Sequence, residues 1–256
     1  MCFEPESTPP IPPSENVRTS TRRLVLEAPD GNHLRAFEAV GGGDGASAVV
    51  VLPDVRGLFT FYEELAVRLA EAGHDAVAID YFGRTAGTGP RPDDFPYMEH
   101  VERTTHSGVA ADVASAVNHL RSGMPGRPVF TVGFCFGGSN SWFQAANRHG
   151  LAGVIGFYGH PERERPPGGG TVVSRVGEMT CPLLGLMAGD DPGIPPEVVA
   201  EFERALTAAG VEHELVTYPG APHSFFDRRH DDFAGESADA WRRVLAFIGR
   251  AGGAHG

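Results

Sequence analysis

The sequence predicts an α/β fold in which a mostly parallel sheet carries helices on both faces. Three observations predict it. Strand-like and helix-like segments alternate between residues 46 and 250. The strand-like runs there are short, apolar and rich in β-branched residues, as in strands buried on both sides. Two further strand-like stretches precede the alternation. Alternating elements form βαβ units, whose crossover helices cover both faces of a parallel sheet.

The two stretches at the start, 21–28 and 33–40, are joined by the turn sequence Pro-Asp-Gly-Asn. A link of four residues suits an antiparallel pair, so we expect antiparallel strands at the N-terminal edge of the sheet. Residues 1–16 carry five prolines, which fix φ and remove backbone donors. We therefore expect residues 1–17 to form a flexible arm and residues 18–252 to form a single domain.

From residue 46 onwards, apolar runs predict buried strands, and apolar residues at three- and four-residue spacing predict helices. The predicted strands are 46–52, 76–80, 128–133, 154–158, 182–188 and 213–218. The predicted helices are 61–72, 109–120, 137–147, 196–209 and 236–250. Functional side chains on such a sheet are expected at the carboxyl ends of the strands. The sequence leaves open whether the segment 85–106 covers the site as a lid.

Composition narrows the class of protein. The chain has 256 residues and a net charge of −12, and all 21 basic residues are arginines without a dense tract, which disfavours nucleic-acid binding. No run is apolar and long enough to span a membrane, and the N-terminus lacks a signal-peptide pattern. Cys2, Cys135 and Cys181 are spaced irregularly and do not suggest a disulfide framework. We expect a reduced, cytoplasmic monomer or homodimer that acts on a small molecule.

A predicted strand runs directly into the sequence G-F-C-F-G at residues 133–137, and a helical segment follows. This is the pattern of a nucleophile elbow with Cys135 at its centre. The central residue of such a turn is strained, so the residues two positions away must be small. The thiol lies at a helix N-terminus, where the dipole favours thiolate, and the amide of Phe136 can donate to an oxyanion. The alternative is a buried cysteine that acts as a small apolar residue, and we assign that role to Cys2 and Cys181.

Two candidate partners follow later strands. His223 comes after the predicted strand 213–218, where an imidazole can take a proton from the thiol and return it. Asp191 follows the strand 182–188 and can hold the imidazole tautomer. The sequence offers little ground for preferring Asp191 over Asp190 as the acid. Either aspartate could instead cap the helix that begins near residue 196. We favour Asp191, which gives the order nucleophile, acid, base along the chain.

These motifs resemble the dienelactone hydrolase family. The resemblance rests on the elbow 133–138 and on the segments 189–195 and 218–225, and it spans roughly residues 20–250 in order and spacing. It implies an α/β-hydrolase fold that cleaves lactones such as carboxymethylenebutenolide, or related esters, with a Cys-His-Asp triad and an acyl-thioester intermediate. The family works without a cofactor, and the spacing of histidines and acids here offers no metal site.

The resemblance also implies further roles. Asp54 stands where the best-known members have a glutamate that activates the thiol, and it is one methylene shorter. Val55 matches the second oxyanion amide. Arg84 matches an arginine that holds the substrate carboxylate, with a surface arginine as the alternative. Tyr81 and Trp142 are candidate pocket residues, or else packing residues.

The position of the family's second arginine holds Asp227 in this chain, so the substrate charge is left open. Three other functions remain as alternatives. A carboxylesterase or thioesterase on the same scaffold would share the fold and the triad. A thiol redox protein would need a resolving cysteine, and no C-x-x-C includes Cys135. A binding protein without catalysis would not need all three groups of the triad.

Overall fold

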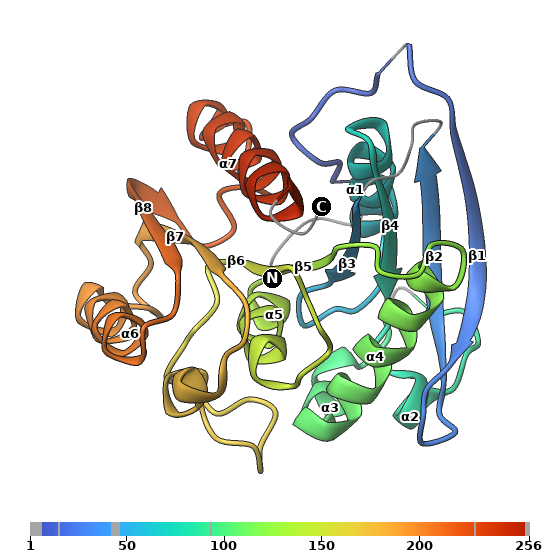
Figure 1. Cartoon of the computed structure of the whole chain (residues 1–256), viewed down its shortest axis with the longest axis horizontal. Coiled ribbons are helices and arrows are strands. Elements are labelled where there is room, and N and C mark those ends of the chain that lie inside the picture. Colours follow the sequence, from blue (N-terminus) through green and yellow to red (C-terminus); the bar gives the residue numbers. More distant parts are fainter. Residues whose placement is uncertain (1–6, 15, 42–46, 93, 228, 254–256) are drawn as a thin grey trace.

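A computed structural model describes residues 7–14, 16–41, 47–92, 94–227 and 229–253. Within these ranges, eight strands form one sheet in the order β1-β2-β4-β3-β5-β6-β7-β8 (Figure 1). The strands are β1 (Thr19–Glu27), β2 (His33–Gly41), β3 (Ser47–Leu52), β4 (His74–Ile79), β5 (Val129–Phe134), β6 (Gly153–Phe157), β7 (Leu183–Asp190) and β8 (His213–Pro222).

The direction of the strands follows the sequence pattern. The neighbours from β4 to β8 pair in parallel, and their central members β3, β5 and β6 are buried along their whole length. Strand β2 pairs antiparallel with both β1 and β4. Strand β1 is mostly exposed, as an edge strand can be. The predicted mostly parallel sheet with an antiparallel N-terminal edge is therefore confirmed.

Helices cover both faces of the sheet. Figure 1 shows α1 (Thr60–Glu71) and α7 (Ala234–Gly253) on one side, and α4 (His106–Ser122), α5 (Phe136–Phe143) and α6 (Pro196–Ala209) on the other. Successive strand residues point to opposite faces, so Val49 and Val51 of β3 pack with α1 while Val50 packs with α4. Two apolar cores result, one on each side of the sheet.

Three short elements were not predicted: α2 (Gly83–Ala86), α3 (Tyr97–Val101) and the 3₁₀ turn η2 (Val173–Glu178). Each has too few residues to show a helical period. The helix predicted at 137–147 is α-helical only to Phe143 and continues as the 3₁₀ turn η1 (Gln144–Ala146). Strand β8 also runs four residues beyond its predicted end, because Pro222 pairs with Asp190 after a break in register. This extension carries the chain to the residue before His223.

The N-terminal arm was expected to be flexible. Residues 1–6 and 15 lie outside the described residues. In the described part no helix or strand precedes β1, as expected, but the segment packs on the molecule. Pro9 is buried, Ile11 packs against the core, and the amide of Ser14 donates to Glu71 in α1 at 3.2 Å. The described part of the arm therefore covers one end of α1.

The carboxyl ends of the parallel strands bring the candidate residues to one edge of the sheet. Cys135 follows β5, Asp191 follows β7 and His223 follows β8. Tyr158, which the sequence did not single out, follows β6 at the same edge. Asp54 follows β3 by two residues. Because these strands run in the same direction, the residues meet although the sequence separates them widely.

Candidate active site

Cys135 occupies a strained turn between β5 and α5. Its φ is 56° and its ψ is −113°, a conformation that L residues rarely adopt. A Cβ atom on Gly133 would lie 2.0 Å from the carbonyl oxygen of Gly137, and one on Gly137 would lie 2.1 Å from the carbonyl oxygen of Leu52. Only glycine fits at both positions, so the predicted reason for the G-x-C-x-G pattern is seen in the packing.

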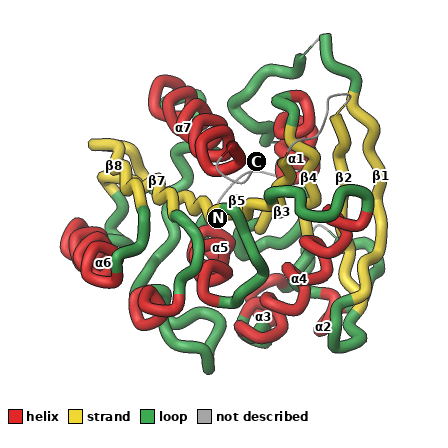
Figure 2. The backbone as a smooth tube through the Cα atoms, viewed as in Figure 1, coloured by secondary structure: helices red, strands yellow, loops and turns green. Residues whose placement is uncertain are grey.

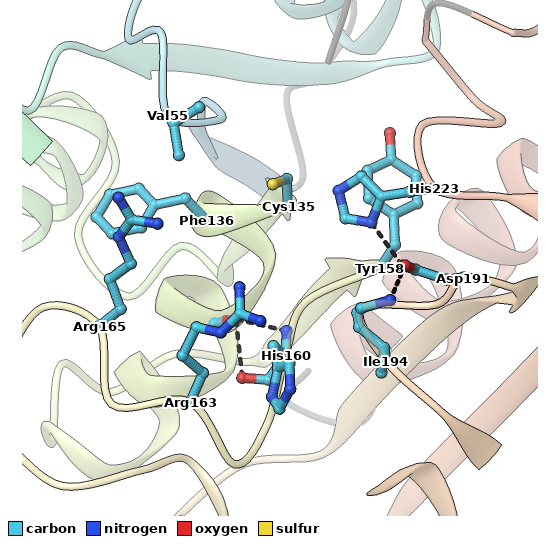
Figure 3. A pocket seen from close by; sticks show the side chains of 12 residues that line it. Val55, Cys135, Phe136, Tyr158, His160, Arg163, Arg165, Asp191, Ile194 and His223 are labelled. Carbon is cyan, nitrogen blue, oxygen red and sulfur yellow. Dashed lines mark hydrogen bonds and ion pairs between the residues drawn. The ribbon is translucent and has the colours of Figure 1, made fainter. Parts of the chain in front are cut away.

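His223 and Asp191 form a hydrogen-bonded pair. The Nδ1 atom of His223 lies 2.6 Å from Oδ2 of Asp191, and the amide of Gly193 donates to Oδ1 at 2.9 Å (Figure 3). Burial opposes the charge on Asp191, but the bond to His223, the imidazole charge and the Gly193 amide together lower the pKa of its carboxyl. An ionised carboxylate only accepts hydrogen bonds, so the Nδ1 atom carries a proton. In the neutral imidazole, Nε2 is then the basic nitrogen, and Figure 3 shows it on the side of Cys135.

The hydrogen bond to His223 shows which of the two neighbouring aspartates is the candidate acid. Helix α6 is capped by Pro195 without a side-chain hydrogen bond, so neither Asp190 nor Asp191 caps it. Asp190 is exposed, whereas Asp191 is buried beside His223. The choice of Asp191 over Asp190 therefore agrees with the geometry.

One cavity contains the expected catalytic groups. Its empty volume is about 470 Å³, which includes space open to solvent. Its lining comprises Val55, Cys135, Phe136, Ser139, Tyr158, His160, Arg163, Arg165, Asp191, Gly193, Ile194 and His223. The structure thus brings together the predicted nucleophile, base and acid, and both residues whose amides were expected to form an oxyanion hole.

Asp54 lies next to this cavity but is not part of its lining. It is fully buried, and its Oδ1 atom accepts a hydrogen bond from the amide of Arg56 at 2.8 Å. Its own amide donates to the hydroxyl oxygen of Tyr62 at 3.0 Å. These contacts fix the turn that presents Val55. A direct role of Asp54 in thiol activation stays a prediction.

Tyr81 and Trp142 are packing residues, and the expectation that they line the pocket is corrected. Both are almost completely buried and neither belongs to the cavity lining. Tyr81 donates from its hydroxyl to the carbonyl of Pro53 at 2.9 Å, and its ring packs edge-on against Phe136 at 5.3 Å. Trp142 donates to the carbonyl of Leu184 at 3.0 Å. Tyr81 therefore supports both candidate oxyanion segments from behind.

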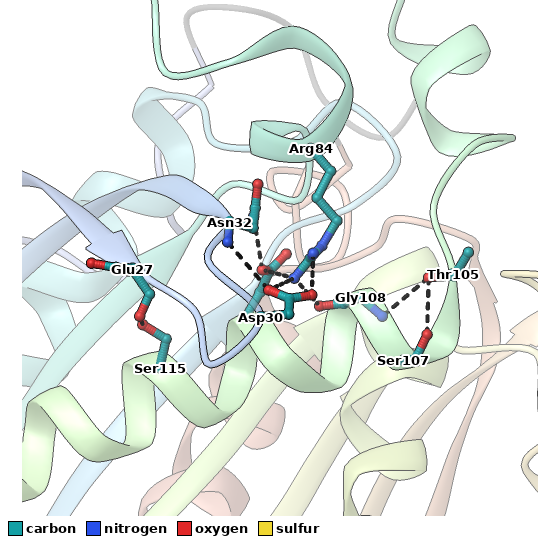
Figure 4. A network of polar contacts seen from close by, with 9 residues as sticks. Glu27, Asp30, Asn32, Arg84, Thr105, Ser107, Gly108 and Ser115 are labelled. Carbon is teal, nitrogen blue, oxygen red and sulfur yellow. Dashed lines mark hydrogen bonds and ion pairs between the residues drawn. The ribbon is translucent and has the colours of Figure 1, made fainter.

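The expectation for Arg84 is also corrected, because it is absent from the cavity lining. Its Nη2 atom donates to Asp112 at 2.8 Å and to the carbonyl of Gly108 at 3.2 Å, and its guanidinium also binds Asp30 (Figure 4). Burial raises the pKa of Asp112 to about 6, although the charge of Arg84 opposes this. Arg84 thus connects the β1–β2 turn to α4. Asp30 and Asp112 occupy the guanidinium N–H donors that a substrate carboxylate would need.

Several cavity residues were not predicted, and most lie in the long segment 158–172 after β6 (Figure 2). His160 is fixed there by Ser139, whose Oγ atom accepts its amide at 2.8 Å and donates to its carbonyl at 3.2 Å. Arg163 and Arg165 follow. The sequence could have indicated Tyr158, because it comes directly after a parallel strand. The rest of the segment has no periodic pattern that would place its side chains in the cavity. The segment 85–106 contributes nothing to the lining.

Among the described residues, no group of three or more histidine, cysteine or acidic side chains is placed to hold a metal ion. No helix in this part of the chain is long and apolar enough to cross a membrane.

The chain is 29% identical over 268 residues to a carboxymethylenebutenolidase of Rhodococcus opacus, an alignment that covers 98% of this chain and 97% of the relative. A provisionally named carboxymethylenebutenolidase of Salmonella typhi is also 29% identical, with 83% and 81% covered. A solved structure from Klebsiella pneumoniae, provisionally named a dienelactone hydrolase, superposes with a TM-score of 0.79 at 24% identity, covering 91% of this chain and 99% of that chain.

These likenesses agree with the α/β-hydrolase fold and with the motifs at the strand ends. A model of the dienelactone hydrolase family matches residues 36–252, which is most of the chain and includes Cys135, Asp191 and His223. The resemblance noted in the sequence is thereby confirmed: the chain belongs to the dienelactone hydrolase family and is a hydrolase.

Proposed function

We propose that this hydrolase cleaves small lactones or esters of the dienelactone type with Cys135 as nucleophile, His223 as base and Asp191 as orienting acid. One observation carries the proposal. A cysteine in a strained strand-to-helix turn shares a cavity with an imidazole whose tautomer is set by a buried carboxylate. These are the parts that acyl transfer requires.

In the first step, Nε2 of His223 takes the proton of the Cys135 thiol as Sγ attacks the ester carbonyl carbon. The carbonyl oxygen becomes an oxyanion, and the amides of Phe136 and Val55 are placed to donate to it. Each such donor is typically worth about 3 kcal/mol in the transition state. Collapse of the intermediate breaks the carbon–oxygen bond, and the imidazolium returns the proton to the leaving oxygen. In a lactone, that hydroxyl stays attached to the acyl group.

In the second step, water hydrolyses the acyl-thioester. His223 removes a proton from the water, which attacks the thioester carbonyl, and the thiolate of Cys135 leaves. The Asp191 carboxylate stabilises the imidazolium in both steps. A thiolate attack suits activated esters and strained or conjugated lactones better than plain alkyl esters, so we infer a preference for activated substrates.

The fixed backbone around the thiol supports this assignment. The amide of Cys135 donates to the carbonyl of Phe157 at 3.0 Å, and its own carbonyl accepts from Gly138 and Ser139. The next amide, that of Phe136, begins α5, where backbone donors lack helical partners and point toward a developing anion. The oxyanion therefore forms where donors are already oriented.

The test is hydrolysis of a dienelactone and of p-nitrophenyl acetate by wild type, Cys135→Ala and His223→Ala. Cys181→Ala is a matched control, because Cys181 is buried outside the cavity and burial raises the pKa of its thiol to about 12. The proposal expects both active-site variants to lose both activities while the control keeps them. The ratio between the two substrates separates a lactonase from a general carboxylesterase or thioesterase. Turnover that survives in Cys135→Ala would refute the proposal.

A further inference from the structure

Two arginines line the cavity on a wall that the proposed triad does not use. Arg163 and Arg165 lie in the segment 158–172 and both belong to the lining around Cys135. Figure 3 shows their guanidinium groups turned towards the cavity, with Arg165 on the far side of Cys135 from His223. A substrate whose carbonyl lies at the thiol therefore has two cations within the same cavity.

The hydrogen-bond donors of both guanidinium groups remain available to a ligand. In the described part of the chain, neither Arg163 nor Arg165 forms an ion pair with a carboxylate. The Nη2 atom of Arg165 donates to the sulfur of Met98 at 3.9 Å. A thioether is a weak acceptor. Arg84 and Arg91, by contrast, are each bound to a buried aspartate.

The acidic side chains nearest to the two arginines have other partners or face solvent. Glu164 lies between them in sequence, and its Oε1 atom accepts the amides of residues 168–170 at 2.8, 3.1 and 3.1 Å. Asp191 is bound to His223. Glu162 is exposed. Neither Glu162 nor Glu164 belongs to the cavity lining, so Arg163 and Arg165 are the charged side chains that this segment presents to the cavity.

The charge of Arg163 reaches the inside of the cavity. His160 lines the cavity beside it, and burial, followed by the charge of Arg163, lowers the pKa of its imidazole. Glu162 and Asp191 oppose that shift but do not reverse it. An anion bound between the arginines would weaken the effect of Arg163 on His160, which gives a readout that does not depend on catalysis.

On the basis of the proposed function, we propose that Arg163 and Arg165 select esters and lactones that carry a carboxylate. A guanidinium binds a carboxylate through two parallel hydrogen bonds. Held in this way, the carboxylate lies away from His223 while the carbonyl lies at Cys135. The family resemblance places this task on Arg84, but Asp30 and Asp112 bind that side chain here. The chain therefore meets the same need from a different segment.

The test compares two esters with the same leaving group and the same acyl length. Mono-p-nitrophenyl succinate carries a free carboxylate, and p-nitrophenyl butyrate does not. We expect the ratio of kcat/KM for succinate over butyrate to fall about tenfold or more in Arg163→Gln and in Arg165→Gln, mainly through KM. Arg165→Lys should restore part of the ratio, because it keeps the charge but loses the fork. Added salt should lower the wild-type ratio.

Arg18→Gln is the matched control. Arg18 is exposed, lies outside the cavity lining and changes the net charge by the same amount, so the ratio should not change. A ratio that is the same in wild type and in both cavity variants would overturn the inference. If Cys135→Ala still abolished hydrolysis of both esters in that case, the proposed function would stand without it.

A binding measurement tests the proposed carboxylate site independently of the proposed hydrolysis. Succinate is titrated into Cys135→Ala protein, and the His160 imidazole is followed by NMR. We expect succinate to raise the pKa of His160, and Arg163→Gln to weaken succinate binding about tenfold. This result would support the anion site even if no ester were hydrolysed. Equal succinate binding with and without Arg163 would contradict it.

Discussion

Asp191 and His223 are joined by a hydrogen bond of 2.6 Å between Oδ2 and Nδ1, although 32 residues separate them in the sequence. The bond exists because strands β7 and β8 lie side by side and end at the same edge of the sheet. It fixes which imidazole nitrogen is left to act as a base. Several measurable consequences depend on this bond and on the geometry around Cys135.

Asp191→Asn should lower kcat/KM by a factor of about a hundred to ten thousand. An asparagine side chain can donate to Nδ1 and stabilise the tautomer in which Nε2 carries the proton, so the base is lost. The measurement is p-nitrophenyl acetate hydrolysis at pH 7. Asp190→Asn is the control, because Asp190 is exposed. Equal losses in the two variants would mean that the pair with His223 is not what matters.

The same carboxylate should make stability depend on pH in a defined direction. The pKa of Asp191 is lowered from its usual 3.8, because the stabilising contacts of the ionised form outweigh the cost of burial. The ionised form therefore stabilises the folded state above pH 3.8, and this contribution is lost as pH falls towards the lowered pKa. We expect the difference in free energy of unfolding between wild type and Asp191→Asn to shrink as the pH falls below about 4. Urea titrations from pH 3 to pH 7 would measure it, and a difference that grows on acidification would be contrary to this sign.

Gly137→Ala should destabilise the fold by more than about 2 kcal/mol. The new Cβ atom would lie 2.1 Å from the carbonyl oxygen of Leu52, which is backbone and cannot move aside cheaply. Gly249→Ala in α7 is the matched control, since its Cβ atom would meet nothing within 4 Å. That change should be neutral or stabilise by up to about 1 kcal/mol. Thermal or urea unfolding compares the two, and similar values would contradict the packing seen at the elbow.

Arg84→Gln should reduce stability without changing the preference for a charged substrate. The change removes a cation beside Asp112, which is nearly fully buried, so the remaining carboxylate is left poorly compensated. We expect a loss of about 1–3 kcal/mol at pH 7. The loss should be smaller near pH 5, below the pKa of about 6 for Asp112, where its carboxyl is mostly protonated. A large drop in the succinate-to-butyrate ratio would instead place Arg84 at the substrate.

Much of the site could be predicted because it depends on local sequence and strand order. The G-x-C-x-G spacing reports a steric requirement that Gly133 and Gly137 meet directly. Asp191 and His223 could be predicted because each follows a recognisable strand, and parallel strands end at one edge of the sheet. The same reasoning gave the fold and the antiparallel pair at its edge.

The rest depends on packing that the sequence does not display. Whether Trp142 faces the cavity or the core is decided by the rotation of α5 against the sheet, and its indole reaches Leu184. Arg84 binds Asp112, which lies 28 residues away on α4. No local sequence pattern shows where that helix packs on the sheet. Arg163 and Arg165 were missed because the path of their segment is set by tertiary contacts, such as the pair of hydrogen bonds between Ser139 and His160.

The central claim is that Cys135 forms a covalent acyl-thioester. The most direct test is to mix the protein with p-nitrophenyl acetate, quench with acid during turnover and map the peptides by mass spectrometry. We predict one acetyl group on the peptide that contains Cys135, its absence from the peptide that contains Cys181, and no labelling in Cys135→Ala. Steady hydrolysis with no acetyl group on Cys135, or with the label on another residue, would contradict the account.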